Sequence, residues 1–194
     1  MFAKIYSAAV YGVDAYGVEI EVNGAGGDPN IVSVGLPDAA VRESRDRVTT
    51  AIANSGYFWP RGRTTINLTP AAIKKEGPSF DLPIALGMMA VTEELDSSPF
   101  ENFIFVGELA LDGAVRAVKG VLPVALEARR RGKRALFVPE SNALEAAMVE
   151  KIDIYGVQNL RPDLCFFARR YCTAADARRS HGVFRHPPRL RCRF

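Results

Sequence analysis

The first 160 residues of this 194-residue chain contain neither cysteine nor histidine; all five such residues come later, at Cys165, Cys172, His181, His186 and Cys192. This excludes a Cys–His nucleophile pair and the usual Cys/His zinc site from residues 1–160. The chain also has no apolar run near the roughly 18 residues that a membrane span needs. Its first residues are not a basic region followed by a long apolar run, so they do not resemble a secretory signal. We therefore expect a cytoplasmic protein without a membrane partner.

Two nucleotide-binding patterns are missing as well. No string has the four-residue spacing between Gly and Gly-Lys-Ser/Thr that a P-loop requires. No helix pattern opens directly after Gly24-x-Gly26-Gly27, as a dinucleotide-binding turn would need. We interpret residues 24–27 as a plain loop and predict that this chain alone binds no ATP, metal ion or other cofactor.

The charge divides the chain into two segments. Residues 161–194 contain nine arginines and two aspartates, a net of +7, which leaves −4 for residues 1–160 of a chain whose total is +3. We predict one domain at 1–160 and a basic, Arg- and Cys-rich tail at 161–194 that is disordered or frame-shifted. If the chain contacts DNA, we expect the contact to come from arginines of this tail, such as Arg169, Arg170, Arg178 and Arg179.

Apolar periodicity predicts a mixed α/β fold. Residues 1–10 and 13–22 alternate as two strands of an antiparallel sheet. Further strands are expected at 31–34, 64–68, 103–106, 135–138 and 152–155, and a hairpin at 108–117 around Asp112-Gly113. Helices are expected from Asp38 as N-cap to Asn54, at 82–91, at 121–131, and from a cap at Ser141-Asn142 to about residue 149. The second half alternates strand and helix, which predicts βαβ units with parallel pairing.

The stretch from Lys74 to Pro83 leads into the most apolar of these helices. Residues 82–91 are apolar almost all round, which is typical of a helix buried in the middle of a domain. We expect Asp81, or else Ser79, to be its N-cap. Lys74 and Lys75 are interpreted as a solvated pair, with an anion contact as the alternative. The chemical question is whether Ser79 acts as a nucleophile.

Four residues are candidates for a subunit interface: Arg42, Arg45, Arg47 and Trp59. The arginines lie in a charged stretch of the 38–54 helix, which is either a solvated face or a subunit contact, where arginine is favoured. Trp59 lies in an aromatic, basic loop. We favour an apolar cluster under that loop over stacking on a nucleic acid base.

Four strings resemble the N-terminal domain of the ComM/YifB family of magnesium-chelatase-like AAA+ ATPases: residues 35–48, 66–71, 75–86 and 107–113. The resemblance extends over about residues 1–160. It implies a ribosomal-protein-like α/β fold, similar to the proteolytic domain of Lon and the C-terminal domain of RadA. For full-length members it implies a hexamer that uses ATP and magnesium to drive DNA branch migration in natural transformation (competence). The family's AAA+ module is expected after this domain, and its motifs are absent from residues 161–194, so we expect a truncated chain.

The likeness to Lon bears on catalysis. Ser79 matches the nucleophile position of Lon's Ser–Lys dyad, and aligning Gly113 and Val115 puts the lysine position at Leu122. Lys119 lies three residues earlier. A Ser79–Lys119 dyad therefore requires Lys119 to point into the same cleft, and a three-residue offset across a strand-to-helix junction disfavours this.

Three hypotheses follow. The first is a non-catalytic scaffold or assembly domain of a ComM/YifB-type ATPase without its motor, associating with itself or with an AAA+ module. The second is a Lon-like peptidase using Ser79 and Lys119. The third is a small nucleic-acid binder acting through its basic tail. We expect the first, and so predict no enzymatic activity for this chain alone.

Overall fold

The structure is a computed structural model that describes residues 1–160 except 36–37, 61, 72–74, 94 and 96, and describes residues 40 and 42 by their backbone alone. Four strands form the larger sheet, in the order β1-β2-β4-β3. These are β1 (Phe2–Tyr11), β2 (Asp14–Ala25), β3 (Asn30–Val34) and β4 (Arg63–Thr69). β1, β2 and β4 pair antiparallel, whereas β3 is parallel to β4. The predicted mixed α/β class is confirmed.

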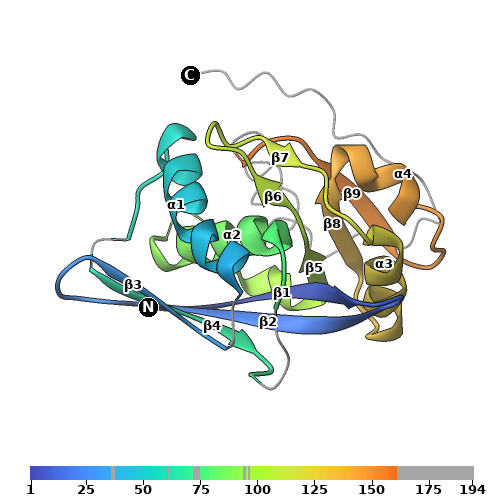
Figure 1. Cartoon of the computed structure of the whole chain (residues 1–194), viewed down its shortest axis with the longest axis horizontal. Helices are drawn as coiled ribbons and strands as arrows, with labels where there is room; N and C mark the ends of the chain where they lie inside the picture. The colour runs from blue at the N-terminus through green and yellow to red at the C-terminus, as the bar shows by residue number, and fades with distance from the viewer. Residues whose placement is uncertain (36–37, 61, 72–74, 94, 96, 161–194) are drawn as a thin grey trace.

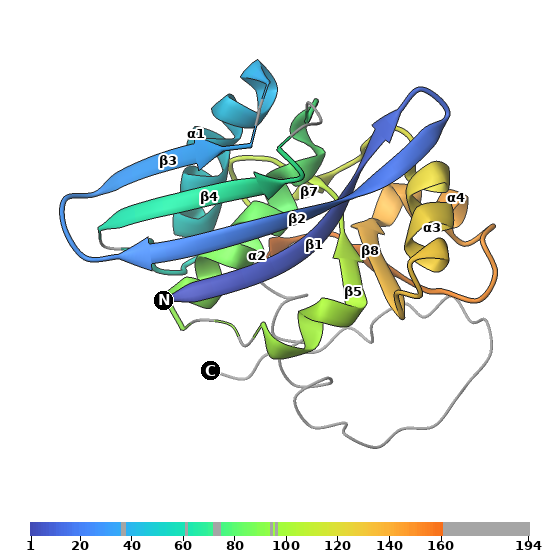
Figure 2. The same ribbon diagram turned by 90° about the horizontal axis from the view of Figure 1, so that it is seen from below.

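The β1–β2 hairpin is a long ribbon in which Phe2 pairs with Asn23 and Tyr11 with Asp14. Ala3, Ile5, Ser7 and Ala9 of β1 are buried on one face, as the alternation predicts, and Ala8 on the other face is buried in a second cluster of apolar residues. Gly12 makes the tight turn with φ of 63°, a left-handed conformation that suits glycine. In Figure 2 the turn end of the ribbon projects beyond α3, at the opposite end from the N-terminus.

Two helices, α1 (Ala39–Asn54) and α2 (Asp81–Val91), cover one face of this sheet (Figure 1). α2 follows a short 3₁₀ turn, η1 (Pro78–Phe80), and every residue of α2 except Ala90 is buried. The prediction of a helix buried on all sides is confirmed. α1 lies against α2 and is amphipathic, with Val41, Val48 and Ile52 inward.

The second half forms a parallel three-stranded sheet in the order β5-β8-β9, with β5 at Phe103–Phe105, β8 at Ala135–Pro139 and β9 at Asp153–Val157. A small hairpin of β6 (Glu108–Leu109) and β7 (Val115–Arg116) precedes α3 (Val121–Arg130), and the short α4 (Ala143–Ala146) precedes β9. Two 3₁₀ turns, η2 (Ser98–Asn102) and η3 (Glu140–Asn142), precede β5 and α4. The predicted parallel pairing is confirmed.

The buried apolar residues form two clusters. The larger lies between the four-stranded sheet, α1, α2 and a stack of phenylalanines from η2, β5 and β8. The smaller lies around α3, β8 and α4. No helix in the described part of the chain is long and apolar enough to cross a bilayer.

The predicted helix caps have different outcomes in the structure. Asp38 caps α1 as predicted, accepting a hydrogen bond from Val41 N at 2.8 Å. Neither Asp81 nor Ser79 caps α2, because Phe80 stands at that position and makes no side-chain cap. The helix expected from Ser141-Asn142 to 149 is only α4. Asn142 stands at its N-cap position but makes no side-chain cap, and its side chain instead bonds the Val118 backbone and the Glu145 carboxylate of α4.

Candidate functional site

The stretch from Lys75 to Asp81 is tied to three other elements through buried polar groups. Asp81 is fully buried, and its carboxylate accepts two hydrogen bonds from Arg47 of α1, at 2.9 and 3.2 Å. It accepts a third from Leu109 N of β6, at 3.2 Å. Burial raises the pKa of Asp81, while the bonds from Arg47 and Leu109 act in the opposite direction. Asp81 therefore joins α1, α2 and β6.

Asp38 makes a second link between α1 and this stretch. Its Oδ1 caps α1, its Oδ2 accepts from Gly77 N at 3.1 Å, and its own N–H donates to Lys75 O at 3.1 Å. The start of α1 and the start of η1 are thus held by one carboxylate. This double role is not visible from the local cap pattern alone.

Lys75 corrects the expectation of a solvated lysine pair. It is completely buried, and its ammonium group donates to the Pro70 carbonyl. Burial lowers the pKa of this lysine. Lys74 lies outside the described residues. A lysine with a depressed pKa is a potential base, but the group bonded to the Lys75 ammonium is a main-chain carbonyl.

Ser79 lies half-buried in η1. Its main-chain carbonyl accepts from Gly107 N at 2.9 Å, and Leu82 N in turn donates to Gly107 O at 3.0 Å. Within the described part of the chain its hydroxyl has no hydrogen-bond partner, so neither a base nor a cap contact is formed there. The contacts that the structure assigns to Ser79 are those of its backbone.

The position predicted from the sequence to match Lon's lysine is in apolar packing. Leu122 is partly buried against the smaller cluster, and its N–H donates to Glu145 Oε1 at 3.1 Å. The N-terminus of α3, a favourable place for an anion, is thus filled by a carboxylate of the chain itself. Lys119 is exposed in the loop between β7 and α3.

The interface candidates separate into different environments. Arg45 is exposed and lies 3.4 Å from the exposed Asp46. Arg47 is bound to Asp81, and its side chain is 25% exposed. For Arg42 only the backbone is described, and Arg169, Arg170, Arg178 and Arg179 lie outside the described residues.

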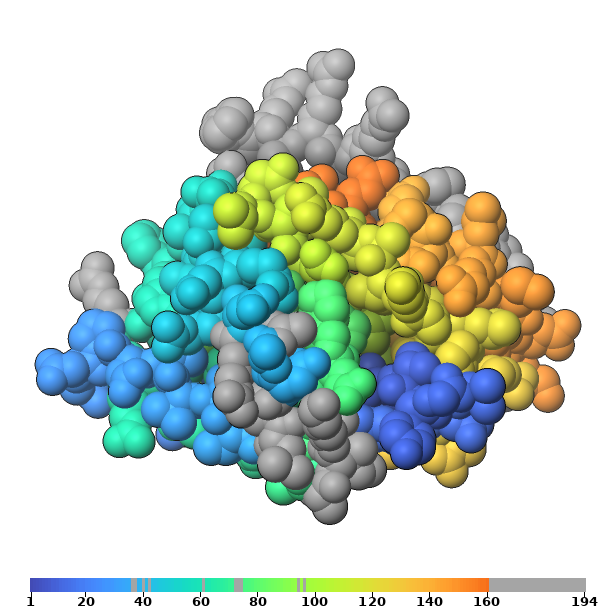
Figure 3. Space-filling model, in the orientation of Figure 1, coloured from blue at the N-terminus to red at the C-terminus, as the bar shows by residue number. Residues whose placement is uncertain are grey.

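α1 lies beside the β6–β7 hairpin on the face of the molecule that Figure 3 shows. There Asn54 Nδ2 of α1 donates to Leu111 O at 2.8 Å.

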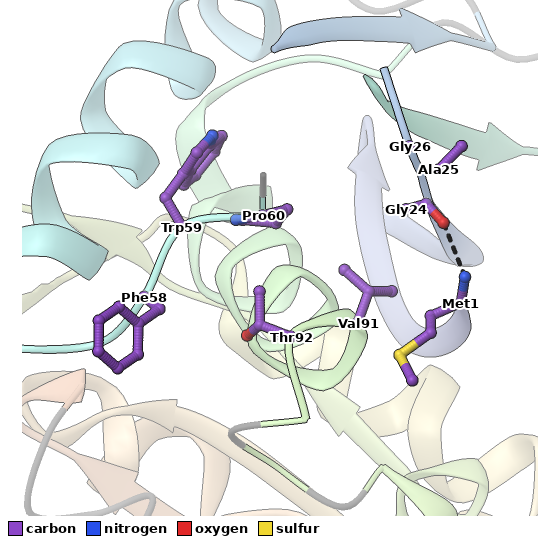
Figure 4. Close-up of a pocket in the computed structure, with 9 residues that line it drawn as sticks. All are labelled: Met1, Gly24, Ala25, Gly26, Phe58, Trp59, Pro60, Val91 and Thr92. Atoms are coloured by element: carbon purple, nitrogen blue, oxygen red, sulfur yellow. Dashed lines mark hydrogen bonds between the residues drawn. The ribbon is translucent and has the colours of Figure 1, made fainter. Parts of the chain in front are cut away.

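Trp59 packs against the larger core cluster and lines a pocket of about 440 Å³. Figure 4 shows the residues around it: Phe58–Pro60 on one side, residues 24–26 of β2 and its loop on the other, with Val91, Thr92 and Met1. The Met1 ammonium donates to Gly24 O at 2.7 Å. Sequence reasoning placed Trp59 in a separate cluster under a loop and missed this pocket, because its walls come from four distant segments.

Comparison with known proteins gives one family match and several relatives. The family described as "Subunit ChlI of Mg-chelatase" matches residues 20–142. The competence protein ComM of Haemophilus influenzae is 45% identical over 158 residues, which are 81% of this chain and 31% of that protein. The YifB protein of Salmonella typhimurium is 41% identical over 169 residues, 87% of this chain and 33% of that protein. A Lon protease of Protochlamydia amoebophila is 31% identical over 45% of this chain. The chain thus spans about a third of the length of ComM and YifB.

Proposed function

The chain belongs to the family of Mg-chelatase ChlI-like proteins that includes ComM and YifB, and from this we propose that it is a non-catalytic assembly domain of a ComM/YifB-type AAA+ ATPase. The proposal is carried by what the structure shows at the two positions where the serine and the lysine of a Lon-type dyad would lie. The Ser79 hydroxyl has no partner among the described residues, and Leu122 packs into the smaller cluster at the lysine position. A serine hydroxyl needs a base to become a nucleophile.

The bonding around Ser79 supports a structural role for its segment. The polar groups from Lys75 to Asp81 bond to α1, to β6 and to the main chain before them. They hold these elements in fixed positions, which suits a domain that presents surfaces to other subunits. In the whole protein, ATP and magnesium would be bound by a separate AAA+ module, and DNA branch migration during natural transformation would be the work of the assembled hexamer. The expected location is the cytoplasm.

The direct test is co-expression of this chain with the ATPase region of the Haemophilus ComM protein. We expect the two to co-purify, and no magnesium-dependent binding of a labelled ATP analogue by this chain alone. The serine is tested with a fluorophosphonate probe, using Ser141→Ala, a change at an exposed serine, as the matched control for Ser79→Ala. Labelling of Ser79 that disappears in Lys119→Ala would replace the assembly role with the peptidase hypothesis. Failure to co-purify would contradict the assembly role itself.

A further inference from the structure

The turn of the β1–β2 hairpin presents large apolar side chains to solvent. Tyr11 is 79% exposed and Val13 is 89% exposed, on either side of Gly12. Figure 2 shows this end of the ribbon projecting past the neighbouring elements. Within the described structure nothing covers these two side chains. Exposed apolar groups gathered on a projecting element are typical of a contact with another molecule.

The other end of the same ribbon carries the apolar pocket. Residues Met1 and 24–26 form one side of it, and Phe58 and Trp59 form the other (Figure 4). Phe58 is 70% exposed at its edge. The pocket is open to solvent and has a volume of about 440 Å³, which is enough to admit an aromatic side chain. β1 is ten residues long, about 33 Å at roughly 3.3 Å per residue, so the tip of this chain cannot reach its own pocket.

Both ends carry exposed charges of both signs. At the tip, Asp14 follows Val13, and Lys119 precedes Gly120, whose Cα lies against the Val10 side chain. At the pocket, the exposed Arg63 pairs in the sheet with Ala25, which lines the pocket, and the exposed Glu93 follows Thr92. A tip and a pocket from two copies can therefore match charges as well as apolar surface, which favours a defined orientation over random association.

We propose that the hairpin tip of one copy of this chain inserts into the pocket lined by Phe58 and Trp59 on the next copy. Tyr11 is the anchor, since buried tyrosines dominate many interfaces. The two surfaces differ, so the contact is head-to-tail, and such contacts build rings or filaments rather than two-fold dimers. This inference rests on the assembly role proposed above and adds the surfaces through which it acts.

The test uses the full chain and sedimentation velocity over a concentration series. We expect the wild type to self-associate, and Tyr11→Ala and Phe58→Ala each to weaken association about 30-fold, the factor typical of an interface hot spot. Both side chains are mostly exposed in one copy, so neither change should unfold the domain. Leu144→Ala is the matched control, because Leu144 is 75% exposed on α4 and belongs to neither surface. It should associate like the wild type.

Mixing the two variants tests the head-to-tail geometry. Tyr11→Ala keeps an intact pocket and Phe58→Ala keeps an intact tip, so an equimolar mixture retains one good contact and should form a heterodimer that grows no further. Association insensitive to both variants, a wild type that is monomeric at all concentrations, or a mixture no more associated than its components would each overturn the inference. If the chain nonetheless co-purifies with the ATPase region of ComM, the assembly role stands and only these surfaces are wrong.

Discussion

Replacing Arg47 by alanine should destabilise the domain far more than the same change at Arg45, two residues away on α1. Arg47 Nε lies 2.9 Å from Asp81, whose side chain is fully buried, whereas Arg45 Nε lies 3.4 Å from an Asp46 that is 84% exposed. Removing one partner of a buried ion pair typically costs about 3–5 kcal/mol because the other charge remains in the interior. The Arg47 side chain is 25% exposed, so water can partly replace it, and we expect the lower end, about 3 kcal/mol.

For a domain of this size that loss corresponds to a fall in melting temperature of about 6–12 °C. Arg45→Ala should cost less than about 0.5 kcal/mol, since exposed pairs contribute little. Thermal unfolding followed by circular dichroism measures both. If the two variants melt within one or two degrees of each other, the reasoning about the Arg47–Asp81 pair is refuted.

The same variant has a defined pH dependence. Burial already raises the pKa of Asp81 in the folded protein, and Arg47 opposes that effect. Without Arg47 the folded-state pKa rises further, so the folded variant holds a proton that the unfolded chain releases near pH 4. By linkage the free energy of unfolding of the variant falls as the pH rises from about 4 through its folded pKa. The deficit relative to wild type should therefore be small at low pH, where Asp81 is protonated in both, and full at neutral pH.

Four further substitutions have expected outcomes that the same melts measure. Gly35→Ala should cost at least about 2 kcal/mol, because φ is 97° and a Cβ there would lie 2.1 Å from Leu68 O; Gly27→Ala, at φ of 114° in open space, should cost less. Asn142→Ala should cost about 2 kcal/mol, because it removes both hydrogen bonds to the Val118 backbone, at 2.9 and 3.0 Å. Ser79→Ala should change stability by less than about 0.5 kcal/mol, because its hydroxyl has no partner within the described structure, and a larger loss would reveal a bond.

The features that the sequence predicted well are those encoded over short distances. Alternation identified β1 and β2, all-round apolarity identified α2 as buried, and the residue before α1 identified its cap. Each depends on side-chain periods of two or about 3.6 residues or on a contact three residues away. The parallel order of β5, β8 and β9 followed from strand–helix alternation in the same way.

The candidate site was predicted less well, because its contacts join distant residues. Arg47 and Asp81 are 34 positions apart, and nothing in the charged stretch of α1 distinguishes Arg47 from Arg45. One signal was present: Asp81 stands at the start of the most apolar helix of the chain, and a buried carboxylate in such a place must find a cation or donors. Lys75 gave no comparable signal, since nothing in the sequence indicates that its ammonium group donates to the Pro70 carbonyl.

The bonds around Ser79 also explain why a serine at the start of a buried helix does not by itself indicate catalysis. Ser79 O accepts from Gly107 N, which carries η1 alongside β6, and Asp81 accepts from Leu109 N two residues further on. The segment therefore runs beside β6, with its backbone and the Asp81 carboxylate hydrogen-bonded. The Ser79 hydroxyl has no partner among the described residues. A nucleophile needs the reverse arrangement, in which the hydroxyl is bonded to a base and held by a supporting residue. Asp81, two residues after the serine, instead joins α1 to β6. The segment therefore fixes the positions of helices, and substitutions at its bonded groups should first lower the stability of the domain.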